Sequence, residues 1–255
     1  MSQTFLPKIL DQKAREVATL PQEEVGELRQ TYSFYEYLKA HSDQVQVIAE
    51  VKKASPSLGS INLDVDILDQ AKTYETAGAA MISVLTDPSF FKGDISYLAQ
   101  ISQAVSIPTL AKDFIIDEKQ IVRSRNAGAI VILLIVAALT KERLKALYDF
   151  ATDLGLEVLV ETHNQEELAI AHAIGAKIIG VNNRDLVSFD VDIDTTKELA
   201  KDFIDGPVYV SESGFSTGDH VAQVAPYVHA VLVGTALMTA EDVAQTVKEL
   251  QIDKG

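Results

Sequence analysis

The sequence contains no cysteine, which excludes disulfide bonds, thiolate metal sites and cysteine nucleophiles. The same absence is typical of proteins kept in a reducing compartment, so we expect a cytoplasmic protein. Long apolar runs are also missing: the longest, residues 129–139, falls short of the roughly 18 residues that a membrane-spanning helix needs. The N-terminus lacks a basic segment followed by an apolar one, so we expect neither a secretion signal nor a membrane partner.

Basic residues are scarce, with 22 Lys and Arg against 37 Asp and Glu, and the formal net charge is −15. A surface of this sign repels nucleic acid and anionic lipid, so we expect no nucleic-acid partner. An anionic substrate would need a local cluster of Lys, Arg or backbone N–H groups. Cations that lie at the ends of predicted strands are therefore informative.

The chain has 255 residues, of which 47% are hydrophobic, and this length is typical of a single α/β barrel of about 250 residues. A strand–loop–helix pattern repeats eight times from Val45 onward. The predicted strands are Val45–Lys52, Ala80–Leu85, Thr109–Asp113, Ala129–Ile135, Glu157–Glu161, Lys177–Asn182, Val208–Ser211 and Ala230–Val233. This alternation implies a parallel sheet with right-handed crossovers, and eight units favour a closed (β/α)8 TIM barrel. A doubly wound open sheet is the alternative, but no GxGxxG turn follows the first strand.

Two amphipathic stretches precede the first predicted strand. Their apolar spacing predicts helices from about Leu6 to Ala40, interrupted at Pro21, and we expect them to cap one end of the core. Later helices are predicted over Asp66–Ala77, Glu118–Asn126 and Ala240–Leu250, and from Ile95, Thr140 and Asn164 onward. No linker divides the chain, so we expect one domain over residues 1–255, with residues 1–44 as its helical N-terminal extension.

The first predicted strand ends in charge, in the stretch VIAEVKKASPSLGSI. Side chains alternate along a strand, so Glu50 and Lys52 share one face and Val51 takes the other. Four more strands end in polar residues, namely Lys112, Glu161, Asn182 with Arg184 beyond it, and Glu212 with Ser213. Each could be a solvated ion pair at the rim, but the chemistry of TIM barrels lies at these strand ends. Five strands with the same feature therefore indicate a shared site.

Lysines and carboxylates that converge in a partly dry cavity serve as acids and bases. Burial lowers the pKa of a lysine and raises that of a glutamate, so we predict that both approach neutrality here. Lys112 is the candidate proton donor to a carbonyl, and Glu161 is the candidate base. The five histidines share no metal-ligand spacing, so we expect no metal site. His163 lies beside the rim and is predicted to have a structural or solvated role.

Two late loops contain glycine at strand ends: Gly214 in SESGFSTG, and Gly234 with Thr235 in VGTA. Loops after the last two strands of such barrels often hold phosphate, and glycine lets backbone N–H groups approach the anion. Ser55, in the first loop, could close over the same phosphate. The alternative is that both glycines only relieve tight turns.

Phenylalanines also follow strand ends, at Phe90, Phe91 and Phe114. Near a site they would suit an aromatic or apolar part of the substrate, although packing alone is the other interpretation.

Seven segments, in order, carry a resemblance: IAEVKKASPS, LAKDFII, LLIVAAL, LVETH, IGVNNRDL, VSESGF and VLVGTALM. Together they resemble the indole-3-glycerol phosphate synthase family of tryptophan biosynthesis, over essentially the whole chain. No second catalytic domain is present, so the chain is similar to the monofunctional form. The resemblance implies ring closure, decarboxylation and dehydration of 1-(2-carboxyphenylamino)-1-deoxyribulose 5-phosphate, without cofactor or metal. It also implies a cytoplasmic enzyme that works as a monomer.

The resemblance implies a role for each candidate. Lys52, beside Glu50, would lie near the carboxylate that is lost, and Lys112 would polarise the ketone as general acid. Glu161 would be the acid and base of the dehydration. The remaining residues would orient or bind the substrate: Asn182 and Ser213 for orientation; Ser55, Arg184, Glu212, Gly214, Gly234 and Thr235 for polar or phosphate groups; Phe91 and Phe114 for the anthranilate ring.

One departure is Leu58, which stands where many relatives have a basic residue, so the first loop carries less positive charge. Two other functions remain open from the residues alone. A Schiff-base aldolase would use Lys112 as its nucleophile. A barrel that only senses or scaffolds a sugar phosphate would bind without turnover.

Overall fold

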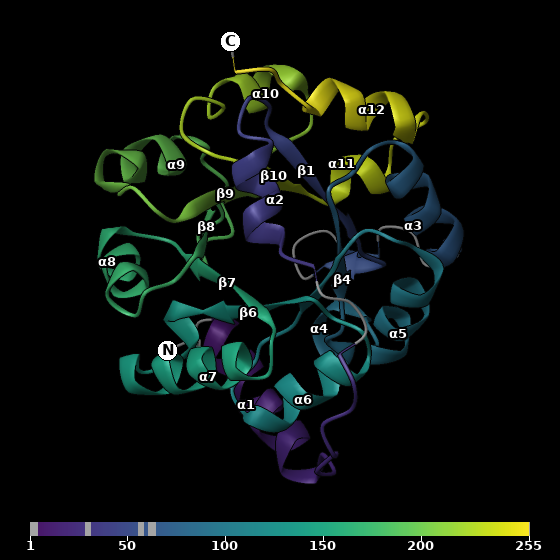
Figure 1. Cartoon of the computed structure of the whole chain (residues 1–255), viewed down its shortest axis with the longest axis vertical. Helices are drawn as coiled ribbons and strands as arrows, with labels where there is room; N and C mark the ends of the chain where they lie inside the picture. Colours follow the sequence, from purple (N-terminus) through teal and green to yellow (C-terminus); the bar gives the residue numbers. More distant parts are fainter. Residues whose placement is uncertain (1–4, 29–31, 56–58, 61–64, 255) are drawn as a thin grey trace.

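The computed structural model describes residues 5–28, 32–55, 59–60 and 65–254, with the side chains of Ser55 and Ser60 excepted. Within these residues, eight parallel strands form a closed barrel in which β1 pairs with both β4 and β10 (Figure 1). The strands are β1 (Gln46–Val51), β4 (Met81–Leu85), β5 (Thr109–Lys112), β6 (Val131–Ile135), β7 (Glu157–Thr162), β8 (Ile178–Asn182), β9 (Val208–Glu212) and β10 (Ala230–Val233). The predicted (β/α)8 fold is confirmed, and closure excludes the open sheet. A short antiparallel pair in the loop after β1, β2 (Ala54–Ser55) with β3 (Gly59–Ser60), was not predicted.

The strands are apolar on both faces because both are covered. In β1, Val47, Ala49 and Val51 belong to the outer cluster that packs against helices. Ile48 belongs to the inner cluster that fills the barrel. Glu50 follows Ile48 by two residues and therefore points inward, as predicted.

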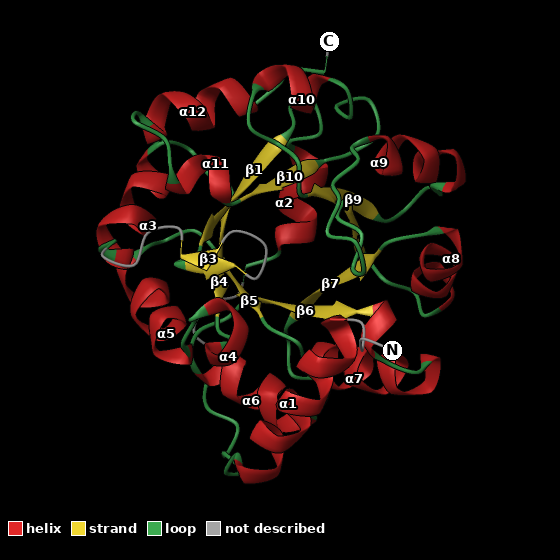
Figure 2. Ribbon diagram, turned by 180° about the vertical axis from the view of Figure 1, so that it is seen from behind, coloured by secondary structure: helices red, strands yellow, loops and turns green. Residues whose placement is uncertain are grey.

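Helices surround the barrel (Figure 2). They are α3 (Ile67–Thr76), α4 (Pro88–Phe91), α5 (Ile95–Ala104), α6 (Glu118–Asn126), α7 (Lys141–Asp153), α8 (Gln165–Ala173), α9 (Asp194–Leu199), α10 (Gly218–Ala222), α11 (Thr235–Met238) and α12 (Val243–Leu250), with 3₁₀ turns η1 (Val136–Ala138) and η2 (Ala200–Asp202). Side-chain caps explain most starts, as at Asp66, Thr140 and Asn164. The last helix was predicted to begin at Ala240 but begins after Asp242, whose carboxylate caps it.

The N-terminal extension was predicted to cap one end of the core. In the structure its two helices instead lie at opposite ends of the barrel. Helix α2 (Phe34–Ala40) crosses the centre of the barrel in Figure 1, and Phe34 and Leu38 are fully buried in the inner cluster. The Glu157 carboxylate, at the start of β7, accepts hydrogen bonds from the Ser33 hydroxyl at 2.6 Å and the Phe34 N–H at 2.7 Å. Because Ser33 caps α2, this helix is shorter than the predicted one.

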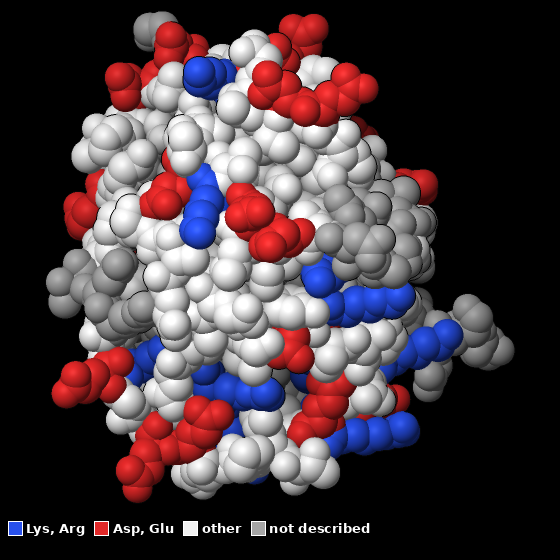
Figure 3. Space-filling view, turned by 90° about the vertical axis from the view of Figure 1, so that its right-hand side faces the viewer, with Lys and Arg blue, Asp and Glu red and all other residues white. Residues whose placement is uncertain are grey.

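The first helix, α1 (Phe5–Thr19), packs at the opposite end, where the strands finish. The surface carries the excess acid: Figure 3 shows carboxylates spread over one face and most Lys and Arg gathered in its lower part. In the described part of the chain, no helix is long and apolar enough to cross a membrane.

Candidate active site

A cavity of about 530 Å³ opens at the C-terminal ends of the strands. It gathers nearly all of the side chains that the sequence singled out. Its lining includes Glu50, Lys52, Phe91, Lys112, Phe114, Glu161, Asn182, Arg184, Glu212, Ser213, Gly214, Gly234 and Thr235. The Ser55 side chain and Leu58 lie outside the described residues. Strand ends far apart in the sequence therefore do meet at one mouth.

Strand alternation explains why these side chains point inward. Two residues before Lys112, Glu161 and Glu212 stand Leu110, Leu159 and Val210, all in the inner cluster. The three polar residues come from β5, β7 and β9, and alternate strands of such a barrel contribute to the same layer of side chains. The inner face thus changes from apolar to charged at one level, which forms the floor of the cavity.

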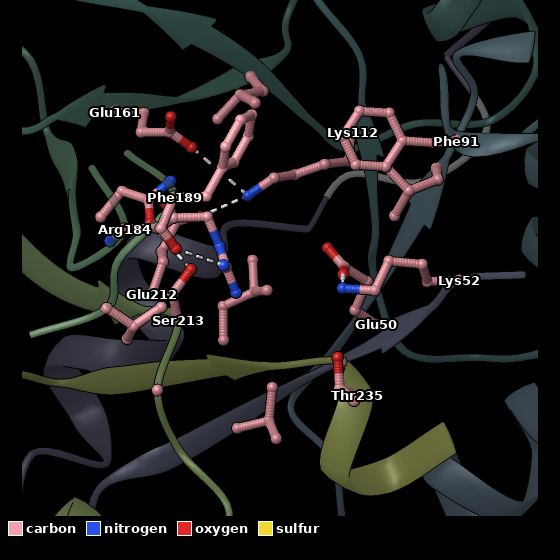
Figure 4. A pocket seen from close by; sticks show the side chains of 18 of the residues that line it. Glu50, Lys52, Phe91, Lys112, Glu161, Arg184, Phe189, Glu212, Ser213 and Thr235 are labelled. Atoms are coloured by element: carbon pink, nitrogen blue, oxygen red, sulfur yellow. Dashed lines mark hydrogen bonds and ion pairs between the residues drawn. The ribbon is translucent and has the colours of Figure 1, made fainter. Parts of the chain in front are cut away.

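Three ion pairs around two lysines occupy this floor (Figure 4). The Lys112 ammonium forms an ion pair with the Glu212 carboxylate and lies 3.5 Å from Glu161 Oε2. Across the cavity, Lys52 Nζ lies 2.8 Å from Glu50 Oε1. The carboxylates are buried, with side-chain exposures of 6% for Glu50, 3% for Glu161 and 1% for Glu212. Each buried carboxylate is therefore compensated by a nearby ammonium.

The pKa values depart from the prediction that burial brings lysine and glutamate toward neutrality. Burial opposes the charge of Glu161, but Lys112 and His163 outweigh it and lower the pKa of Glu161 to about 2. Burial likewise opposes the ammonium of Lys112, but Glu212, Glu161 and Glu50 raise its pKa above the ordinary value. The prediction was therefore wrong for both residues, because their opposite charges face each other.

Glu212 follows the predicted direction. Burial raises the pKa of Glu212 to about 7; the ammonium of Lys112 opposes this shift and the charge of Glu161 adds to it. Lys112 is thus held as the ammonium and Glu161 as the carboxylate. Of these three groups, Glu212 has the pKa that lies nearest to neutrality.

The strand-end polar groups of β8 and β9 form a connected network. Asn182 Oδ1 accepts hydrogen bonds from the Ser213 hydroxyl at 2.8 Å and the Arg184 backbone N–H at 3.1 Å. Ser213 has a left-handed backbone, φ 68°, which is strained for a residue with a side chain. The Asn183 amide donates to the Ser213 carbonyl at 3.0 Å and stabilises this conformation. Sequence reasoning missed Asn183, which is buried and also contacts Ser211 and Thr196.

Arg184 reaches along the loop after β8. Its Nη1 donates to the Phe189 carbonyl at 2.9 Å, and burial lowers the pKa of its guanidinium. Gly214, with φ 96°, follows Ser213, and a Cβ there would lie 2.9 Å from Val191 Cγ1. Gly214 is therefore required by its conformation and by its neighbour.

An aromatic and aliphatic wall faces the charged floor. The rings of Phe91 and Phe114 have centroids 6.0 Å apart. Helix α1 adds Phe5, Leu6 and Ile9, which sequence reasoning did not assign to the site. Their apolar spacing indicated that one face of α1 is buried, but it did not show which part of the protein that face packs against.

Lys13, also on α1, is a buried cation that the sequence did not single out. Its Nζ lies 2.7 Å from Asp87 Oδ1, 2.8 Å from Asp113 Oδ1 and 2.9 Å from Glu16 Oε2. Asp87 caps α4, which carries Phe91, and Asp113 follows Lys112. Lys13 thus joins α1 to two segments that line the cavity.

The backbone comes close to the charged side chains at two glycines. A Cβ on Gly234 would lie 2.6 Å from Glu50 Oε1 and 2.9 Å from Lys52 Nζ. A Cβ on Gly180 would lie 2.4 Å from Glu212 Oε1. Both glycines therefore make room for buried carboxylates. Among the described residues, no group of three or more His, Asp or Glu side chains is arranged to hold a metal ion.

Paired ammonium and carboxylate groups in a half-apolar cavity are suited to proton transfer on a small molecule, so fold and cavity define an α/β-barrel enzyme. Comparison with known proteins identifies its kind. The family model described as indole-3-glycerol phosphate synthase matches residues 6–250, and the chain belongs to that family. The family predicted from the sequence is thereby confirmed. Its members are carboxy-lyases of tryptophan biosynthesis with a phosphorylated small-molecule substrate.

Curated relatives agree along the whole chain. The indole-3-glycerol phosphate synthases of Streptococcus thermophilus and Streptococcus mutans are each 69% identical over 255 residues, covering all of both chains. That of Streptococcus pneumoniae is 66% identical over the same length. A solved thiamine phosphate pyrophosphorylase from Pyrococcus furiosus shares the fold, with TM-score 0.60 and 15% identity over 82% of this chain and 94% of that one.

Proposed function

We propose that this chain converts 1-(2-carboxyphenylamino)-1-deoxyribulose 5-phosphate to indole-3-glycerol phosphate, with loss of carbon dioxide and water. The observation that carries the proposal is the pair of opposed lysines, Lys112 and Lys52, each beside a buried carboxylate in one cavity. The substrate has two anionic groups and a ketone, and these need cations and a proton donor. The apolar wall suits its anthranilate ring.

Ring closure joins the ring carbon that bears the carboxylate to the ketone carbon. In our proposal the Lys112 ammonium gives its proton to the ketone oxygen, which becomes a hydroxyl group. Lys52 holds the carboxylate, and Glu50 keeps Lys52 in position at 2.8 Å. The carboxylate then leaves as carbon dioxide, and its bonding electrons return to the ring.

Dehydration needs a proton for the departing hydroxyl group and a base for the proton released from the substrate. We assign Glu161 as the acid and base of this step: its carboxylate takes the proton that the substrate releases and then passes it to the departing hydroxyl group, while Asn182 and Ser213 orient the substrate. We propose that the polar and phosphate groups of the substrate are bound by Ser55, Arg184, Glu212, Gly214, Gly234 and Thr235. The anthranilate ring would pack against Phe91 and Phe114. We further propose that residues 1–255 form one domain that works as a cytoplasmic monomer.

A product assay tests the function. Purified protein mixed with the synthetic substrate should develop the fluorescence of an indole product, without added metal or cofactor. Binding of substrate without turnover by folded protein would contradict the proposal and favour a sensor barrel. A borohydride-trapped adduct on Lys112 would favour an aldolase instead, although the raised pKa of Lys112 counts against a neutral amine nucleophile.

Gly234→Ala tests the close approach of the backbone to the Glu50–Lys52 pair. The new Cβ would collide with both charged groups, so we expect turnover to fall by about 10²-fold through their displacement. The backbone at Gly234, φ −113°, needs no glycine, so the melting temperature should stay near that of the original protein. Steady-state kinetics and thermal denaturation measure the two effects. Unchanged turnover would show that the pair can shift without consequence.

A further inference from the structure

We propose that His163 is a positioning residue that holds Glu161 in its orientation and in its charged form from outside the cavity. The inference rests on the proposed function, because it concerns the group that we assign to dehydration. His163 does not line the cavity; it stands directly behind Glu161. The sequence predicted a structural or solvated role, yet its side chain is only 10% exposed.

The imidazole lies between two carboxylates. Its Nε2 is 3.2 Å from Glu161 Oε1, and its Nδ1 is 2.9 Å from Glu167 Oε2. The contact with Glu161 is an ion pair without hydrogen-bond alignment, since Nε2 has no well-directed acceptor within the described part of the chain. Lys112 meets the other oxygen, Oε2, of Glu161 at 3.5 Å. Each oxygen of this carboxylate therefore faces a cation, and Lys112 is shared with Glu212.

Glu167 is itself held firmly. Its Oε2 also accepts the His163 backbone N–H at 2.9 Å, and its Oε1 accepts from the Asn164 amide at 2.8 Å. Asn164 caps α8, so Glu167 lies in the first turn of that helix, where a carboxylate is stabilised. A continuous chain of contacts thus runs from the start of α8 through Glu167 and His163 to Glu161.

The charges around His163 favour its protonated form. Burial opposes the cation, but Glu161 on β7 and Glu167 on α8 outweigh burial and raise the pKa of His163 to about 10. The charge of His163 also lowers the pKa of Asp185, in the loop after β8, and Lys112 on β5 lies on the other side of Glu161. At neutral pH His163 is therefore a cation. Its loss would raise the pKa of Glu161 and retain the proton on Glu161 at higher pH.

The experiment compares His163→Gln and Glu167→Gln with a control, His172→Gln. His172 lies on α8, but its Nε2 contacts the Tyr209 hydroxyl at 3.1 Å, away from the cavity. We expect His163→Gln to lower kcat by about tenfold at neutral pH, with little change in KM. The pKa of the Glu161 carboxylate, followed by its carboxylate signal in NMR, should rise by about one unit in this variant. Glu167→Gln should raise this pKa by less, and His172→Gln should leave it unchanged.

A purely structural role would lower the melting temperature without changing the pKa of Glu161, so an unchanged pKa of Glu161 in His163→Gln overturns the proposal. If that variant does not fold, Glu167→Gln decides in the same way. A second readout needs no turnover: the His163 ring signals in NMR should titrate well above pH 7 in the substrate-free protein. Titration near pH 6.5 also overturns the inference. If His163 titrates well above pH 7 but the protein makes no indole, the result would instead count against the proposed function.

Discussion

Replacing Lys112 with methionine should lower kcat by about 10²–10⁴-fold, the range for a lost proton-transfer group. Methionine keeps the length and apolar stem of lysine but has no proton to give to the ketone. It also leaves Glu161 and Glu212 facing each other without the ammonium between them. The loss should therefore appear in kcat more than in KM, measured by the indole product assay on protein whose circular dichroism is unchanged.

Lys145→Met is the matched control for this result. Lys145 is on α7 and is about half exposed, and among the described residues its ion pair is with its helical neighbour Asp149. Its removal takes away the same charge at the surface, where an ion pair contributes little. Activity of the Lys112 variant within a few-fold of this control would refute the assignment of Lys112 as general acid.

Lys13→Met should lower the free energy of unfolding by about 3–5 kcal/mol, the usual loss when one partner of a buried ion pair is removed. The side chain of Lys13 is 3% exposed and that of Asp87 is 0% exposed, so water cannot replace the lost contact. Asp87 and Asp113 would face each other beside α1 without the ammonium between them. Urea denaturation at constant pH measures the change.

Lys8→Met, on the exposed side of the same helix, is the control and should change the free energy of unfolding by about 0.5 kcal/mol or less. A loss below about 1 kcal/mol in Lys13→Met would mean that α1 is held by its apolar contacts alone. We also expect a higher KM in Lys13→Met. Helix α1 supplies Phe5 and Ile9 to the wall of the cavity, and looser docking would open that wall.

Lys112 and the partner of Lys13, Asp113, are adjacent residues at the end of β5. Lys112 is the last residue of β5 and points into the barrel, whereas Asp113 comes next and meets Lys13. Alternation along the extended chain separates the two directions. The docking of α1 and the placement of Lys112 therefore depend on adjacent residues whose side chains point in different directions.

Much of the fold was readable from the sequence because each strand carries its own signal. β10 has the predicted bounds, Ala230–Val233, and α6 has the predicted bounds, Glu118–Asn126. The short helices α9 and α10 were not predicted, because five or six residues do not establish a helical period. The packing site of α1 could not be predicted from the sequence either. An amphipathic pattern shows that one face of a helix is buried, but it does not show which surface that face contacts.

The gathering of Glu50, Lys112 and Glu161 at one mouth followed from the sequence alone. Each ends a buried strand, and a barrel brings all such ends together. Which of these groups carries a proton was decided only by the tertiary structure. A pKa depends on charges within a few ångströms, and the partners of Glu161 come from β5 and from the residue behind it, His163. Chain order determines which residues reach the mouth, but only packing determines which oxygen faces which ammonium.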